Sequence, residues 1–264
     1  MELPDYIQSV TFRLAHPDVP GSKAFRLATG LLRRMGVPLD ALNTRLPGED
    51  RPMRRRLREA RRTCPAGNFA VGAIINRAVS RLAPGEAFVA LGVSDGFPLL
   101  AAISGNPDKP CIGVDLTAGS ESRSSARPQF LRHFESLRTP DHQLHRLSFR
   151  DYFAQLHELP IGCCLIGASA ADDPLERLNT AEPHLAENGV VLVENANVAS
   201  HRSAALAFIG SSANQYRILL DQRTPHHGEL TLGNGLLVFQ LLGRNAAAKR
   251  PLQKPASPVL VPAA

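Results

Sequence analysis

The sequence has no tryptophan, three methionines and four cysteines, and it contains no long hydrophobic run. A membrane-spanning helix needs ~20 consecutive apolar residues, so we expect no segment that crosses a bilayer. The first residues, Met1 to Asp5, also lack the basic and apolar regions of a secretory signal. The hydrophobic content of 44% is that of an ordinary soluble globular protein. We therefore expect a cytoplasmic location.

The four cysteines form no C-x-x-C pair, so the sequence indicates no disulfide framework. Cys111, Cys163 and Cys164 fall within apolar runs typical of strands, and Cys64 ends the apolar stripe of a predicted helix. We predict that all four are buried free thiols without a catalytic or metal-binding role.

Two phosphate-binding motifs are absent. The chain has no G-x-x-x-x-G-K-[ST] pattern, which counts against phosphoryl transfer. A dinucleotide-binding turn reads G-x-G-x-x-G, whereas the turn from Gly92 to Gly96 has Ser94 in place of the middle glycine. Asp95 is the stronger objection, because a carboxylate at the start of the following helix would repel a phosphate. The turn is better suited to a nucleoside that carries positive charge.

The formal net charge of +6 is concentrated in one segment. Residues 51–62 hold seven arginines and one acid, Glu59, and the remainder of the chain is close to neutral. Two interpretations stay open, namely the solvated face of an amphipathic helix and a contact with nucleic acid. No aromatic residue is interleaved with the arginines, which favours the solvated face.

The hydrophobic pattern divides the chain into three segments, of which the two terminal ones flank a larger central segment. Residues 1–66 predict a helical appendage, and residues 245–264 predict a disordered tail because they are rich in alanine, proline and lysine. One helix of the appendage begins after the cap residue Ser22, and a second begins at Glu49 and Asp50. Their apolar residues recur at helical spacing. They are Phe25, Ala28, Leu31, Leu32 and Met35 in the first helix, and Met53, Leu57, Ala60 and Cys64 in the second.

The central zone, residues 67–244, alternates helices with short apolar strands. This order predicts an α/β fold of the Rossmann-like kind, with a seven-stranded, mostly parallel sheet and helices on both faces. One predicted helix runs from Pro174 to Leu185. The predicted strands are 87–91, 111–114, 143–147, 161–166, 190–193, 216–220 and 236–242.

Ligands of such a sheet bind beyond the carboxyl ends of the strands, so the residues that follow each strand are the candidates for a site. The turn from Gly92 to Gly96 follows the first strand, and Asp115 follows the second, 19 residues beyond Gly96. The two glycines permit a tight turn and a close approach of ligand to backbone. An acid at this place suits the hydroxyl groups of a ribose. A simple strand-to-helix turn is the alternative for the glycines.

On these residues the chain resembles the class I methyltransferases that depend on S-adenosylmethionine, most nearly their small-molecule and sugar O-methyltransferase branch. The motifs are Ala90 to Gly96, Ile112 to Asp115, and Ala181 to Asn195, and the last strand pair would be the family's hairpin. The resemblance implies S-adenosyl-L-methionine as the cofactor. It places Gly92, Val93, Ser94 and Gly96 at the methionine end, Asp115 and Leu116 at the ribose, Ser148 and Phe149 at the adenine, and Gly167 and Ala168 at the turn beyond the fourth strand.

The chain departs from the family where Ala90 and Gly167 stand in place of acids. Glu194 and Asn195 would offer two oxygen ligands to a cation, but Gly167 cannot supply a third, so we expect no metal. Methyl transfer requires mainly alignment and one base. The catalytic candidates are therefore Glu194, Asn195 and His226. The alternatives are that Glu194 and Asn195 cap the next segment, that His226 is a solvated loop residue, and that Ser148 is only an N-cap.

Three hypotheses follow for function. The first is methyl transfer to a small-molecule or sugar hydroxyl, with the N-terminal helices as a lid or as the contact of a homodimer. The second is a catalytically degenerate, methyltransferase-like module for binding or assembly. The third is a nucleic-acid methyltransferase guided by the arginine-rich helix.

Overall fold

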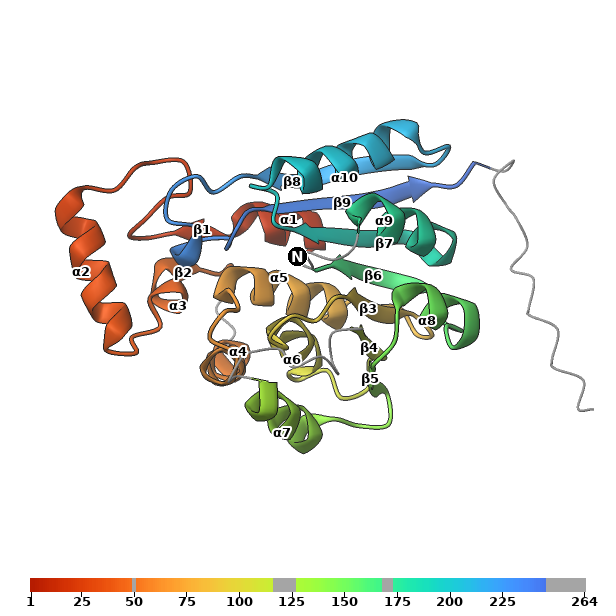
Figure 1. The fold of residues 1–264 in the computed structure, drawn as a ribbon, viewed down its shortest axis with the longest axis horizontal. Coiled ribbons are helices and arrows are strands. Elements are labelled where there is room, and N and C mark those ends of the chain that lie inside the picture. Colours follow the sequence, from red (N-terminus) through yellow and green to blue (C-terminus); the bar gives the residue numbers. More distant parts are fainter. Residues whose placement is uncertain (49–50, 116–126, 168–172, 246–264) are drawn as a thin grey trace, which may run out of the picture.

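The computed structural model describes residues 1–48, 51–115, 127–167 and 173–245, and Figure 1 shows how their helices and strands are arranged. The predicted tail from residue 246 onward and the predicted loop at residues 117–126 lie outside the described residues. The first part of the chain is α1 (Leu3–Ser9), β1 (Thr11–Phe12), α2 (Lys23–Arg34), α3 (Leu39–Asn43), β2 (Thr44–Arg45) and α4 (Arg51–Thr63).

The predicted seven-stranded sheet is confirmed, with strand order β5-β4-β3-β6-β7-β9-β8. The five strands from β5 to β7 are parallel, and β9 pairs antiparallel with both β7 and β8. The elements after α4 are α5 (Phe69–Ser80), β3 (Ala87–Leu91), α6 (Phe97–Ile103), β4 (Cys111–Val114), α7 (Arg127–Leu137), β5 (His142–His145), α8 (Phe149–Gln155), β6 (Ile161–Ile166), α9 (Pro174–Ala181), β7 (Leu185–Glu194), α10 (Ala199–Ser211), β8 (Gln215–Gln222) and β9 (Leu236–Gly243).

Helices cover both faces of the sheet because the buried strands are apolar on both sides. In β3, Phe88 and Ala90 belong to the cluster under α5, α6 and α7, whereas Val89 belongs to the cluster under α8, α9 and α10. Cys163 and Cys164 likewise point to opposite faces. All four cysteines are free and buried, as predicted, and burial raises the pKa of Cys164 to about 12.

The boundaries differ from the prediction around β7. The helix expected to continue to Leu185 ends at Ala181, and a short 3-10 turn follows at Glu182–His184. Pro183 has no N–H for a continuing helix, which explains the early end. The strand expected from residue 190 begins at Leu185 instead.

The N-terminal segment contains more structure than the hydrophobic pattern predicts. Helices α1 and α3 and the small sheet of β1 with β2 were not predicted, because each has seven residues or fewer. Leu3, Tyr6 and Ile7 of α1 join the cluster that also contains the helices α5 and α6. The appendage therefore shares the hydrophobic core of the sheet domain.

The two long N-terminal helices behave differently. The stripe of α4 is buried as predicted at Met53, Leu57 and Ala60. Within the stripe of α2, Phe25 packs against the cluster of Ala15, Leu39 and Leu230, whereas Leu31 and Met35 are 62% and 69% exposed. In Figure 1, α2 extends away from the sheet, so a single chain offers this helix too little surface to cover its apolar residues.

Buried polar side chains attach this segment to the sheet domain. Asn43, which is fully buried, accepts from the backbone N–H of Leu14 and Ala15 at 2.6 and 3.0 Å. Its amide donates to the carbonyl of Leu230 at 2.9 Å, in the loop between β8 and β9. Asp40 accepts from Arg61 Nε and from the backbone N–H of Phe69, both at 2.9 Å. Among the described residues, no helix is long and apolar enough to cross a membrane.

Candidate ligand site at the carboxyl edge of the sheet

The turn after β3 requires glycine at its end. Gly96 has a φ of 99°, and a Cβ at this position would lie 2.1 Å from the ring of Phe130 on α7. Ser94 also has a positive φ, 53°, a conformation that is unusual for a residue other than glycine. Val93 is fully buried, so its side chain belongs to the core and only its backbone is available to a ligand. The turn is thus a tight backbone loop pressed against α7.

The second predicted feature, Asp115, lies beside this turn. Arg127 Nη1 is 3.4 Å from Asp115 Oδ2 and also 3.4 Å from the carbonyl oxygen of Ser94. One guanidinium nitrogen therefore contacts both halves of the predicted site, and the two oxygens lie at most twice that distance apart. Asp115 is 6% exposed. The juxtaposition of turn and acid that the sequence predicts is present in the structure.

Arg127, which the sequence analysis did not identify, is the first residue of α7 and is 8% exposed. Its Nε and Nη2 atoms are buried and have no hydrogen-bond partner in the described part of the chain. The spacing from Arg127 to Phe130 and Phe134 places an arginine on the inward face of α7, which is a signal that the sequence does contain.

The expectation for Asp95 needs correction. Its carboxylate accepts from the backbone N–H of Phe97 at 3.1 Å and from that of Ala66 at 3.0 Å. Asp95 therefore caps α6 and ties the linker before α5 to the turn, instead of directing its charge at a ligand. Burial raises the pKa of Asp95, which is the effect of desolvation on a carboxylate. The preference for a positively charged nucleoside cannot be based on this residue.

The end of β6 meets the end of β3 at Gly167. Its N–H donates to the carbonyl of Leu91 at 2.9 Å, and its own carbonyl accepts from Arg177 Nη1 at 3.0 Å. A Cβ on Gly167 would lie 2.0 Å from the carbonyl oxygen of Gly92. Gly167 is therefore required for the close approach of the two strand ends, and both of its backbone groups are already bonded. Leu116 and Ala168, predicted for the ribose and for this turn, lie outside the described residues.

The residues predicted for the adenine lie at the start of α8, beyond β5. Ser148 Oγ accepts from the backbone N–H of Asp151 at 3.1 Å, so Ser148 is the N-cap of α8. Phe149 is buried in the hydrophobic cluster, and the guanidinium of Arg150 lies 5.1 Å from its ring centre. The N–H of Asp115 donates to the carbonyl of His145, the last residue of β5, so this region adjoins the acid.

The catalytic candidates lie beyond β7 and in the β8–β9 loop. Asn195 has a φ of 63°, and its Oδ1 accepts from the amide of Asn234 at 3.1 Å. Its carbonyl accepts from Val198 N at 2.8 Å, so Asn195 forms a turn that holds the loop. His226 is bound through its backbone N–H to the carbonyl of Pro17 at 3.1 Å. Glu194 is half-buried at the last position of β7. In the part of the chain that the structure describes, no three His, Cys, Asp or Glu residues are grouped to hold a metal ion.

The arginines of α4 are not all solvated, contrary to expectation. Arg54 donates to the carbonyls of Ala41 and Thr44 and lies 5.2 Å from the ring centre of Phe69. Arg61 is paired with Asp40, as described above. Two of the seven arginines therefore hold the N-terminal segment in place.

A cavity of about 510 Å³ lies between the C-terminal half of α4 and the β8–β9 loop. Ala66 in its wall donates its N–H to Asp95 of the glycine turn. Gly233 in the opposite wall precedes Asn234, which is bonded to Asn195. Hydrogen bonds therefore connect the walls of the cavity to Asp95 of the turn and, through Asn234, to Asn195, although none of the predicted site residues that the structure describes lines the cavity itself. Its wall also contains Arg58 and Arg62.

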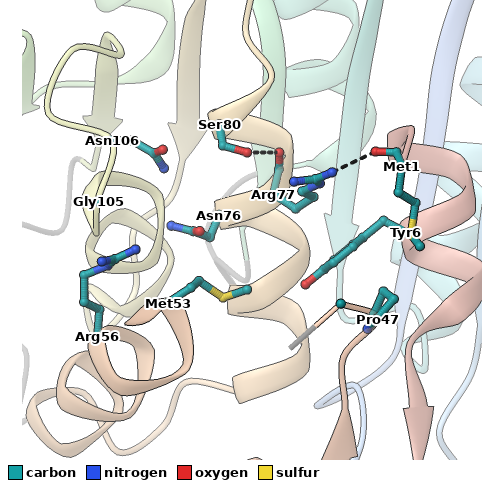
Figure 2. A pocket seen from close by; sticks show the side chains of 11 residues that line it. Met1, Tyr6, Pro47, Met53, Arg56, Asn76, Arg77, Ser80, Gly105 and Asn106 are labelled. Atoms are coloured by element: carbon teal, nitrogen blue, oxygen red, sulfur yellow. Dashed lines mark hydrogen bonds between the residues drawn. The ribbon is translucent and has the colours of Figure 1, made fainter. Parts of the chain in front are cut away.

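A different cavity, of about 310 Å³, is drawn in Figure 2 and contains none of the predicted site residues. It lies between α1, α4, α5 and the turn after α6. Figure 2 shows Arg77 donating to the carbonyl of Met1, a bond of 2.8 Å, which holds the start of the chain on α5. The guanidinium of Arg77 also lies 5.5 Å from the ring centre of Tyr6. These contacts assign this cavity to the attachment of α1.

No family model matches the sequence, and a search of curated proteins finds no match. A solved structure of a protein from Corynebacterium glutamicum covers 85% of this chain and 100% of its own, with a TM-score of 0.54 at 16% identity. A methyltransferase from Geobacter sulfurreducens covers 80% of this chain and 96% of its own, with a TM-score of 0.48 at 18% identity. The O-methyltransferase TomG from Streptomyces achromogenes, solved in complex with SAM, covers 74% and 91%, with a TM-score of 0.48 at 14% identity.

The strand order and the first of these comparisons define its class at the level of fold. The protein has a Rossmann-like α/β fold with a seven-stranded, mostly parallel sheet.

Proposed function

We propose that the protein binds S-adenosyl-L-methionine at the carboxyl edge of the sheet and transfers its methyl group to a small-molecule or sugar hydroxyl. The observation that carries the proposal is the contact of one buried guanidinium with both the glycine turn and the ribose-type acid. An α/β sheet binds nucleosides where such a turn and such an acid converge. Asp115 would accept the ribose hydroxyls, and the backbone of the turn would lie against the methionine end.

The acceptor would occupy the cavity beside α4, because hydrogen bonds of Ala66 and Asn234 connect its walls to Asp95 of the turn after β3 and to Asn195 beyond β7. The cofactor would supply an electrophilic methyl group. The protein would hold the acceptor hydroxyl in line with it and remove its proton. Glu194, at the end of β7, is the stronger candidate for a base, since a carboxylate can take up a proton and the amide of Asn195 cannot. His226 is a second candidate, from the loop that borders the cavity.

Ligand titration tests the cofactor. At ~100 times its dissociation constant a ligand adds ~2.7 kcal/mol of stability, which raises the melting temperature of a protein of this size by ~5–10 °C. We expect this shift with S-adenosylmethionine and S-adenosylhomocysteine and not with NAD. Asp115→Asn should remove it, and Asp108→Asn, an exposed acid before β4, should not. Absence of any shift with either adenosyl compound would refute the proposal.

The second candidate is a methyltransferase-like module that binds without catalysis. It is favoured by Ala90 and Gly167, which replace acids, and by the commitment of both Gly167 backbone groups to internal bonds. Cofactor binding with no transfer to any hydroxyl acceptor would support it. The nucleic-acid alternative is weaker than the sequence suggests, because Arg54 and Arg61 are engaged within the chain. Affinity for RNA that falls with salt and is lost in Arg55→Ala would revive it.

A further inference from the structure

The buried guanidinium of Arg127 has donors that the protein itself does not use. Nη1 contacts Asp115 and the carbonyl of Ser94, while Nε and Nη2 are buried and have no hydrogen-bond partner among the residues that the structure describes. A buried charged donor that makes no hydrogen bond destabilises the protein. Such donors beside a candidate ligand site indicate that a ligand atom completes the bonds.

The geometry of the unused donors specifies the ligand group. Nε and Nη2 lie on the same edge of a guanidinium and donate in parallel, which matches the two oxygens of a carboxylate. The same chain uses this edge elsewhere. Arg202 donates from Nε to Asp221 Oδ1 at 2.9 Å and from Nη2 to Oδ2 at 2.5 Å. The Nε and Nη2 atoms of Arg127 thus offer the same pair of donors that Arg202 uses to bind the carboxylate of Asp221.

The position of Arg127 Nε and Nη2 limits which molecule could supply the carboxylate that binds them. Arg127 is fixed on the glycine turn through Ser94 and on the ribose-type acid through Asp115. Phe130, one turn further along α7, packs where a Cβ of Gly96 would lie, so α7 cannot move away from the turn without losing this contact. A carboxylate at this edge would therefore lie beside both the turn and the acid, so a ligand held by these two features is the source that the contacts favour.

We infer that Arg127 is a cofactor-positioning residue that binds the α-carboxylate of the amino-acid part of S-adenosylmethionine through Nε and Nη2. This inference rests on the proposed function, because it takes the adenosyl cofactor as the occupant. It gives the protein a positive counterpart to Asp115. The acid holds the nucleoside, and the arginine holds the amino-acid end and sets the direction of the sulfonium methyl group.

The test compares two ligands that differ in the amino-acid part. S-adenosylhomocysteine has the α-carboxylate, and 5′-methylthioadenosine has the same nucleoside and sulfur without it. Calorimetry should show that Arg127→Ala weakens binding of S-adenosylhomocysteine by roughly 10- to 100-fold more than binding of methylthioadenosine. Arg127→Lys, which keeps the charge but lacks the paired donors, should give an intermediate loss and covers the case in which the alanine variant does not fold.

The outcomes are distinguishable. If both ligands bind the wild type and Arg127 variants weaken them equally, Arg127 only supports Asp115 and the inference is wrong, while the proposed cofactor stands. The inference also fails if the variants change neither affinity, which would leave the anionic group of an acceptor as the occupant. If neither ligand binds the wild type, the proposed function and this inference both fail. Arg202→Ala, which removes the exposed pair with Asp221, is the matched control and should leave the ratio of the two affinities unchanged.

Discussion

Replacement of Gly167 by alanine should separate the ends of β3 and β6. The added Cβ would lie 2.0 Å from the carbonyl oxygen of Gly92, which is far inside van der Waals contact. That oxygen belongs to the backbone, so it cannot move away by changing a rotamer. Overpacking of this kind costs ~1–3 kcal/mol, and the backbone clash places Gly167→Ala at the upper end of the range.

The same substitution at Gly210 is a matched control. Gly210 lies in α10 with nothing within 4 Å of an added Cβ. Alanine is favoured over glycine inside a helix by ~0.5–1 kcal/mol, so Gly210→Ala should stabilise the protein. Two identical changes are therefore expected to move stability in opposite directions, with a difference of ~4 kcal/mol.

Thermal unfolding measures this difference directly. For a protein of this size, 1 kcal/mol corresponds to a shift of ~2–4 °C, so Gly167→Ala should melt ~6–12 °C below the wild type. Because Gly167 also bonds Leu91 beside the glycine turn, the variant should bind an adenosyl ligand more weakly. A melting temperature within 2 °C of the wild type would show that the strand ends are not in close contact, and the account of Gly167 given above would then be wrong.

Three further results are expected. Asn43→Asp should destabilise the fold by ~2–4 kcal/mol in urea unfolding, because the amide that donates to Leu230 becomes an oxygen; an unchanged midpoint would contradict this. Arg61→Ala should cost ~1–3 kcal/mol because it leaves the buried carboxylate of Asp40 without its ion pair, whereas Arg55→Ala, on the exposed face, should cost nothing measurable. Burial, and secondly the neighbouring His184, lower the pKa of His157 from 6.5 to about 4. Between these two pH values His157 binds fewer protons in the folded than in the unfolded state, so the free energy of unfolding should fall as the pH drops from 6.5 towards 4. His157→Gln should reduce this pH dependence.

The sheet could be predicted from the sequence because its strands are short, apolar and separated by helices of ordinary length. The strand after Gly85 and the stripe of α4 show this, since periodicity alone located both. Periodicity could not identify α1 or α3, because helices of seven and five residues are too short to display a repeat. It also could not show that the apolar residues of α2 would stay exposed, since the pattern records spacing and not the partner surface.

The site was only partly predictable for a different reason. Gly96 and Asp115 could be located because each follows a strand, and backbone topology brings such residues together. The charge that faces a ligand there could not be deduced in the same way. Asp95 stands at the expected place in the sequence, but its carboxylate is used by the N–H groups of Phe97 and Ala66.

The side chains that can bind a ligand at this site therefore depend on which charged groups already make hydrogen bonds within the protein. Asp95 satisfies two backbone donors and so contributes a cap, whereas Arg127 satisfies two acceptors with a single nitrogen and retains a buried edge. The sequence analysis predicted a role at the ligand site for Asp95 and none for Arg127. In the structure Asp95 serves as a helix cap, and Arg127 offers a ligand two parallel donors that no described residue uses, which is the arrangement that binds a carboxylate most specifically.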